Sequence, residues 1–218
     1  MKNVFLTACV LSVCFTSCKK EEKTTLTTTT TDTTLVTTSE VDTTTAGETM
    51  DSAAMDRAWK DYMTPGEQHK MLADETGTWD VTLKFWMAAD AEPQTDKATA
   101  EAKMIMGGRY QEVNYKGTMM GMPWEGKNTI AFNNKSGMFT STFIDNSGTG
   151  MMVATGTYDE PLKAVNYRGE TLDPVTGKTL KYREVYTIVD AKTRKMEMFD
   201  TKGGKPEYKS MEIVMTRK

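Results

Sequence analysis

The alternation of apolar and polar residues after Gly77 constrains the fold of this chain more than any other sequence feature. In the first run, one face carries Trp79, Val81, Leu83, Phe85 and Met87. Successive side chains of a β-strand point to opposite faces, so a period of two predicts strands that bury one face. The same period recurs in the sets Ala100, Ala102, Met104 and Met106; Phe139, Ser141 and Phe143; Tyr182, Tyr186 and Ile188; and Met211, Ile213 and Met215.

Turn-forming residues separate these runs at short intervals. They include Gly107-Gly108, Asn133-Asn134, Asp145 to Gly148, Asp173-Pro174, Asp190-Ala191 and Gly203-Gly204. Because these residue types favour tight turns, the segments predict about ten antiparallel strands in a meander. An open twisted sheet holds that many strands poorly, whereas closure removes its edges. We therefore predict a mainly β domain, an antiparallel β-barrel that encloses a cavity or a packed core.

One or two short helices are expected ahead of the strands. Apolar residues recur at helical spacing over residues 53–63, which favours an amphipathic helix. Thr64-Pro65-Gly66-Glu67 fits a capping box with proline at the first helical position. A second helix is therefore expected to run to about Asp74.

Residues 1–17 have the features of an export signal. Lys2 supplies positive charge, and Val4 to Phe15 form an apolar stretch of twelve residues. This stretch is too short to span a bilayer, which takes about 20 residues. The sequence up to Ser17 and Cys18 resembles the lipobox of bacterial lipoproteins, which implies cleavage between these residues and lipidation of Cys18. The alternative is an incidental cysteine behind an ordinary signal.

The cysteine count narrows the chemistry of the mature chain. The chain has three cysteines, and Cys9 and Cys14 leave with the predicted signal. Lipidation consumes the thiol of Cys18. Under this interpretation the mature protein has no free thiol, which excludes disulfides, thiolate metal sites and cysteine nucleophiles.

A threonine-rich segment follows the predicted anchor. Residues 24–49 contain fifteen threonines and few apolar side chains, so residues 18–54 are expected to form a disordered tether. Lys19-Lys20-Glu21-Glu22 resembles the surface-export signal of Bacteroidetes lipoproteins. Three tripeptides that begin with aspartate resemble the O-glycosylation sequence of that phylum, which makes candidate sites of Thr33, Thr43 and Ser52. A plain solvated linker is the alternative.

Eight short motifs follow one another from residue 64 to residue 218. They are TPGEQHKML, GTWDVTLKFWM, AEAKMIMGGRY, GTMMGMPWEG, FIDNSGTGMM, GTYD, DPVTGK and EIVMTRK. This ordered set resembles the domain-of-unknown-function family 1579 (DUF1579). Phe143 stands where tryptophan is common in the family. The resemblance implies a lipocalin-like barrel over residues 55–218 and no established activity.

Five side chains are candidate contacts for a small apolar or amphipathic ligand: Trp79, Arg109, Met120, Met122 and Trp124. Arg109 follows two glycines and is expected at the barrel mouth, facing a carboxylate or phosphate. The alternative is a salt bridge from Arg109 to Asp80 or Asp145. The apolar segment 117–124 is expected to connect two strands, either as the lip of a site for apolar molecules or as a lid that seals the core.

The sequence favours neither catalysis nor a metal centre. His69 is the one histidine, and no second histidine or cysteine of the mature chain could complete a familiar ligand set with it. It is therefore expected to pack within its helix or to lie at the surface, with haem ligation as the alternative. The eighteen methionines are soft ligands for Cu(I), but their strand spacing favours core filling. No catalytic residue, metal or cofactor is predicted. A net charge of −3 disfavours nucleic acid.

The sequence thus predicts a protein of the cell envelope, lipid-anchored to the outer membrane through Cys18 and displayed on its periplasmic or outer surface. The barrel is expected to bind a small apolar or amphipathic molecule inside or at its mouth. The alternative is a structural or interaction module with a filled barrel. The sequence indicates no oligomeric state.

Overall fold

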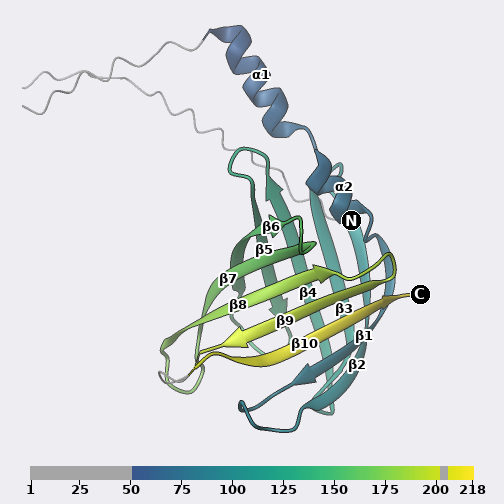
Figure 1. Ribbon diagram of the computed structural model, residues 1–218, viewed down its shortest axis with the longest axis vertical. Helices are drawn as coiled ribbons and strands as arrows, with labels where there is room; N and C mark the ends of the chain where they lie inside the picture. The colour runs from purple at the N-terminus through teal and green to yellow at the C-terminus, as the bar shows by residue number, and fades with distance from the viewer. Residues whose placement is uncertain (1–50, 202–205) are drawn as a thin grey trace, which may run out of the picture. The chain divides into compact units, whose positions relative to one another are not determined.

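The structure, a computed structural model, describes residues 51–201 and 206–218. These residues lie in the compact unit Glu48–Lys218. They form two helices and ten strands (Figure 1): α1 (Ser52–Met63), α2 (Glu67–Ala73), β1 (Gly77–Phe85), β2 (Gln94–Ile105), β3 (Tyr110–Met119), β4 (Met122–Asn133), β5 (Met138–Asp145), β6 (Met152–Asp159), β7 (Ala164–Leu172), β8 (Thr179–Ile188), β9 (Thr193–Asp200) and β10 (Tyr208–Arg217).

Several sequence predictions concern residues outside the described part of the chain. The predicted signal, Cys18, Thr33 and Thr43 belong to this group and stay predictions. Ser52, the third candidate glycosylation site, is the exposed first residue of α1.

The ten strands form one closed antiparallel barrel. Each strand pairs with its neighbours in the sequence, and β1 pairs with β10 to close the sheet. The closing register runs from Trp79 opposite Arg217 to Phe85 opposite Met211. Among the described strands, closure leaves no unpaired sheet edge. The structure therefore confirms the predicted fold class.

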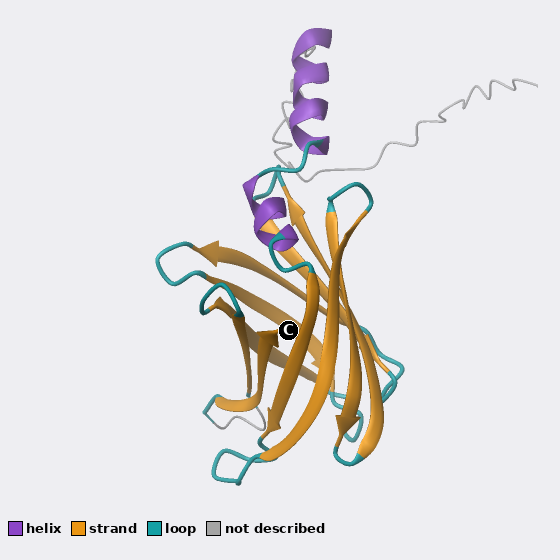
Figure 2. Ribbon diagram, turned by 90° about the vertical axis from the view of Figure 1, so that its right-hand side faces the viewer, coloured by secondary structure: helices purple, strands orange, loops and turns teal. Residues whose placement is uncertain are grey.

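The two ends of the barrel differ. Because an antiparallel meander reverses at each turn, the β1–β2, β3–β4, β5–β6, β7–β8 and β9–β10 turns share one end. The segment between α2 and β1 lies at the other end, called here the helix end, and Figure 2 shows α2 beside it. Leu72 of α2 is buried in the core there, so the helix covers part of this end.

One glycine permits a tight fit between neighbouring strands. A side chain at Gly156 on β6 would overlap the backbone carbonyl of Asn166 on β7. The two strands approach too closely there for any Cβ atom.

The core consists of two clusters that share the barrel interior. One is built from β1, β2, β3, β4 and β10 around Trp79 and Trp124. The other joins strands β5 to β9 to Leu72. Met196 and Met211 contact both clusters.

The segment 117–124 connects two strands as predicted, and it does so as a tight hairpin. Its first residues complete β3, its last residues begin β4, and Met120 and Gly121 make the turn. Both turn residues have positive φ, 53° and 74°, which is typical of a two-residue type I′ turn. The methionine at a position that favours asparagine concealed the turn from sequence reasoning.

The second helix begins later than its sequence predicts. Gly66 occupies the N-cap position of α2, and its N–H donates to Nδ1 of His69 over 3.0 Å. Thr64 instead ends α1, since its hydroxyl donates to the carbonyl of Lys60. The predicted capping box of Thr64 and Glu67 is therefore wrong, because Thr64 serves the preceding helix.

The apolar face of α1 is exposed, although its spacing predicts a packed face. Met55, Trp59, Tyr62 and Met63 are all exposed, and α1 has no buried residue. The helix is joined to the barrel at its C-terminal end, where the Asn134 amide donates to backbone carbonyls including that of Thr64. In the described part of the chain, neither helix is long and apolar enough to cross a membrane.

Candidate functional site

The barrel encloses a cavity of about 260 Å³. Aromatic and methionine side chains supply much of its wall, among them Tyr115, Trp124, Phe143, Met152, Met196 and Met211. Small inward-facing side chains leave the space open, including Ala102, Ser141 and Ala154. Such a cavity, mostly apolar with a few polar groups, is typical of sites for small molecules.

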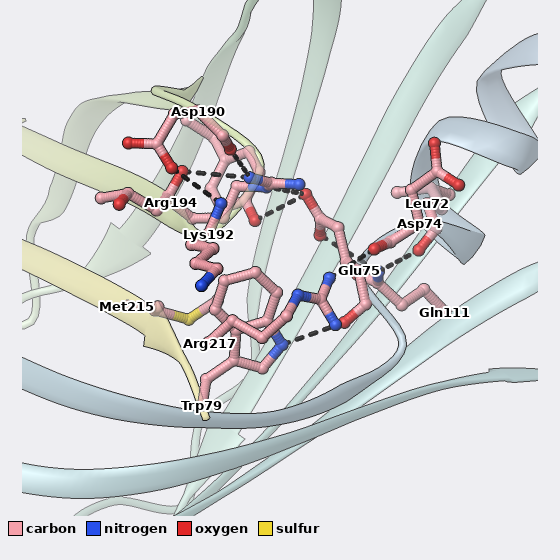
Figure 3. Close-up of polar contacts among 12 residues, drawn as sticks. Leu72, Asp74, Glu75, Trp79, Gln111, Asp190, Lys192, Arg194, Met215 and Arg217 are labelled. Carbon is pink, nitrogen blue, oxygen red and sulfur yellow. Dashed lines mark hydrogen bonds and ion pairs between the residues drawn. The ribbon is translucent and has the colours of Figure 1, made fainter.

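A buried ion pair joins the helix end of the barrel to the sheet (Figure 3). Nε of Arg194 on β9 lies 2.8 Å from Oε1 of Glu75, and both side chains are about 5% exposed or less. Tyr186 donates its hydroxyl to the same oxygen over 2.9 Å. Because Glu75 lies in the segment between α2 and β1, these bonds fix that segment inside the barrel.

Trp79 lies beside this ion pair in the core. Its indole N–H donates to the backbone carbonyl of Glu75, and its ring has no exposed surface. The guanidinium groups of Arg194 and Arg217 lie 5.3 and 4.4 Å from its ring centre. Arg217 also donates to the carbonyls of Asp74 and Thr76. Trp79 therefore supports the fixed segment and does not line the cavity.

Glu184 places a second carboxyl group in the cavity. It lies between Tyr182 and Tyr186 on the inward face of β8 and lines the cavity. Burial raises its pKa to about 7, and the neighbouring Asp200 carboxylate contributes to the rise. Within the described part of the chain its carboxyl has no hydrogen-bond or ion-pair partner. At neutral pH Glu184 is therefore divided between its neutral and charged forms.

Tyrosines surround Glu184 and stay neutral at physiological pH. Burial raises the pKa of Tyr115, Tyr167, Tyr182 and Tyr186. Their hydroxyl groups can donate or accept a hydrogen bond, so they can bind either a donor or an acceptor group of a ligand.

Two amide oxygens in the wall lack a hydrogen-bond donor. These are Oε1 of Gln111 on β3 and Oδ1 of Asn128 on β4. The Gln111 amide N–H₂ donates to the carbonyl of Leu72 and to the carboxylate of Glu75. Both partners are acceptors, so they fix the orientation of this amide and leave its oxygen free.

The structure places one of the five predicted ligand contacts in the cavity wall. Trp124 lines the cavity, where its indole N–H donates to Asp145 over 3.1 Å. Arg109 and Met120 are exposed in turns, and Met122 is the exposed first residue of β4. None of these three lines the cavity, and Trp79 lies in the core beside it. The structure does not bring these five residues together, because the two turns lie at opposite ends of the barrel.

Arg109 does not form the salt bridge to Asp80 or Asp145 that the sequence analysis gave as its alternative role. Its guanidinium donates to the carbonyl of Met106 in the same turn. Asp80 instead forms an ion pair with Lys218, and Asp145 accepts from Trp124. The prediction of a salt bridge from Arg109 to either aspartate is therefore wrong.

His69 is buried and contributes to packing. Its ring meets Phe132 edge-on at 5.8 Å, and burial lowers its pKa. Its Nδ1 accepts the N–H of Gly66, which stabilises the start of α2. Within residues 51–201 and 206–218, no three His, Cys, Asp or Glu side chains are grouped so as to hold a metal ion.

Sequence reasoning missed the polar residues of the interior. Gln111 and Glu184 occupy inward positions on β3 and β8 among mainly apolar and aromatic residues, and Arg194 shares the inward face of β9 with Met196, Met198 and Asp200. Such a polar residue at an inward position of the alternating pattern was the available signal. Glu75 gave no comparable signal, because it lies in a connection without periodicity.

The fold and cavity define a class, the closed antiparallel β-barrels with an internal cavity. Within that class, residues 64–217 match the family described as "Protein of unknown function (DUF1579)". The match covers more than half of the chain, so this protein belongs to the DUF1579 family.

Solved structures of similar fold have low sequence identity to this chain. The crystal structure of Rv2717c from M. tuberculosis is 14% identical, with a TM-score of 0.54, and the match covers 71% of this chain and 99% of that one. The S-type phycobiliprotein lyase CPES from Guillardia theta is 9% identical, with a TM-score of 0.49, and the match covers 73% and 96%. A search of curated proteins found no match. The first likeness supports the barrel fold alone.

Proposed function

We propose that the barrel binds one small apolar or amphipathic molecule in its internal cavity. The cavity of about 260 Å³ is the observation that carries this proposal. An engineered cavity of about 150 Å³ holds benzene, so proportional scaling gives a ligand of about ten non-hydrogen atoms. Methionine side chains in the wall adapt to ligands of different shape.

A structural or interaction module is the competing function. Its supporting observation is the exposed apolar face of α1, which includes Trp59 and Tyr62. Exposed apolar patches mark interaction sites in many proteins. A barrel that serves only this function needs no ligand in its cavity.

Filling the cavity distinguishes these two functions. Ala154→Phe adds a ring to an inward position of β6 and is expected to weaken binding of octan-1-ol at least tenfold, measured by isothermal titration calorimetry. Thr155→Phe adds the same ring to the exposed face of the same strand and should leave binding unchanged. If octan-1-ol binds neither the wild type nor Thr155→Phe, the cavity has no such function.

The same proposal places the protein at the membrane. Cys18 in its lipobox-like sequence supports a lipid anchor, and the Lys19 to Glu22 run supports display at the surface of the outer membrane. A single acyl chain anchors a protein weakly, whereas two or more chains anchor it stably. The threonine-rich segment would then serve as a tether for the barrel.

Cys18→Ala tests the anchor directly. The substitution is expected to abolish labelling by an alkyne analogue of palmitate and to move the protein from the membrane fraction to the soluble fraction, because it removes the acceptor thiol. Cys14→Ala, which changes a residue within the predicted signal, is the matched control. Labelling that persists in Cys18→Ala would contradict the lipobox interpretation.

A further inference from the structure

The unpaired amide oxygens and the carboxylate in the described cavity wall can only accept hydrogen bonds, whereas the tyrosine hydroxyls there can also donate. Gln111 is 1% exposed, and both of the acceptors that hold its N–H₂ group come from the helix end of the barrel. Its Oε1 therefore faces the interior without a donor. A buried acceptor of this kind is seldom left unpaired in a native protein unless a water molecule or ligand supplies the donor.

The charges in the cavity have one sign. Among the described residues that line the cavity, none is lysine, arginine or histidine, whereas three are acidic: Glu75, Asp145 and Glu184. Arg194 neutralises Glu75, and Asp145 accepts from Trp124 and Ser147. Glu184 is thus the one acidic side chain of the described cavity wall that neither a hydrogen bond nor an ion pair holds.

We propose that the molecule bound in the barrel is an amine with an apolar body, and that its ammonium group is bound by Glu184. This inference rests on the proposed function, because it names the chemical class of ligand for the same cavity. A protonated amine offers three hydrogen-bond donors and one positive charge, and the cavity offers a free carboxylate and free amide oxygens. Charge-assisted hydrogen bonds of this kind are stronger than neutral ones.

The same arrangement disfavours a fatty acid. A ligand carboxylate in the cavity would meet the Glu184 carboxylate and unpaired amide oxygens, without a free cation in the described wall to compensate it. Like charges at short range in a site of low dielectric constant repel each other strongly. A neutral alcohol donates one hydrogen bond but gains nothing from the charge.

Amine binding is expected to depend on pH through Glu184. The titratable groups that face this carboxyl are Asp200 on β9, Tyr167 on β7, Tyr182 on β8 and Tyr115 on β3. The tyrosines stay neutral, and Asp200 adds negative charge, which reinforces attraction of a cation. Alkylamines stay protonated below about pH 10, like lysine. Their affinity should therefore fall roughly tenfold from pH 8 to pH 6, as Glu184 gains its proton.

The experiment compares octylamine, octan-1-ol and octanoate by titration calorimetry at pH 8. Octylamine is expected to bind the wild type at least tenfold more tightly than octan-1-ol and octanoate. Glu184→Gln should remove that preference and leave octan-1-ol within about twofold of the wild type, because the amide keeps the shape of the side chain without its charge. Glu170→Gln on β7 is the control, since Glu170 is an exposed partner of Lys181.

The outcomes separate this inference from the proposed function. If octan-1-ol and octylamine bind equally and Glu184→Gln affects neither, the amine inference is wrong while cavity binding stands. If none of the three molecules binds, cavity binding fails and the inference fails with it. If Glu184→Gln does not fold, the pH dependence in the wild type decides, because octylamine affinity that is unchanged between pH 8 and pH 6 overturns the inference.

Discussion

Glu75→Gln is expected to lower the free energy of unfolding by about 3–5 kcal/mol, because it leaves the Arg194 guanidinium buried without a counter-charge. The ion pair is 2.8 Å long and both side chains are almost fully buried. The substitution keeps the size of the side chain, so the loss reports the charge more than the packing. Urea denaturation monitored by tryptophan fluorescence measures the change.

Two further variants give the Glu75 experiment its controls. Glu125→Gln breaks an exposed ion pair with Lys116 and should cost less than about 1 kcal/mol. Arg194→Met combined with Glu75→Gln removes the unpaired charge and should recover part of the loss. If the free energy of unfolding of Glu75→Gln lies within about 1 kcal/mol of the wild type, the ion pair contributes no more than an exposed pair does, which would contradict its burial.

Glu184→Gln is expected to act in the opposite direction and to stabilise the protein at alkaline pH. The pKa of Glu184 is about 7 in the folded protein against an ordinary value of 4.5. A raised pKa means that the folded state holds the proton more tightly than the unfolded state. The stability of the wild type therefore declines as pH rises from about 4.5 to 7, by about 2–3 kcal/mol for this half-buried group.

The glutamine variant lacks this decline, because it does not titrate. It should match the wild type near pH 4 and exceed its free energy of unfolding by about 2–3 kcal/mol at pH 8. Denaturation of both proteins across this range measures the difference, with Glu170→Gln as a variant expected to show none. A difference that is constant with pH, or largest in acid, would show that Glu184 does not titrate as its surroundings indicate.

The two carboxyl groups have different roles in the barrel: Glu75 contributes to stability, and Glu184 is available for binding. Glu75 is fully paired and holds the segment after α2 in place. Glu184 is unpaired and costs stability when charged, although it is available to a ligand. Loss of stability at a binding site is a common consequence of keeping polar groups free for a partner.

The strand pattern was predictable because burial on one face dictates a period of two. Trp79, Val81 and Leu83 lie inward as their spacing predicts, and closure follows from the number of strands. The pattern fails at turns, where side chains leave the alternating register. Met106 continues the spacing of Ala102 and Met104, yet it is exposed with a φ of 50° in the turn after β2.

The cavity was less predictable than the barrel. Its volume depends on how side chains from all around the barrel meet, and no short window of sequence contains those contacts. Arg109 was a candidate because two glycines precede it, and Met120 because the segment around it is apolar, although both lie in exposed turns. The pairing of Glu75 with Arg194 joins residues 119 positions apart, which sequence periodicity does not relate.

The most direct test of cavity binding is the position of a bound molecule in a crystal. Crystals soaked with 8-bromooctan-1-ol, which has about ten non-hydrogen atoms as the cavity requires, allow the bromine to be located by anomalous scattering. Binding in the cavity predicts one bromine peak inside the barrel, in contact with wall residues such as Trp124 and Met196. An anomalous map with peaks only on the outer surface, or an interior filled by side chains, would contradict it.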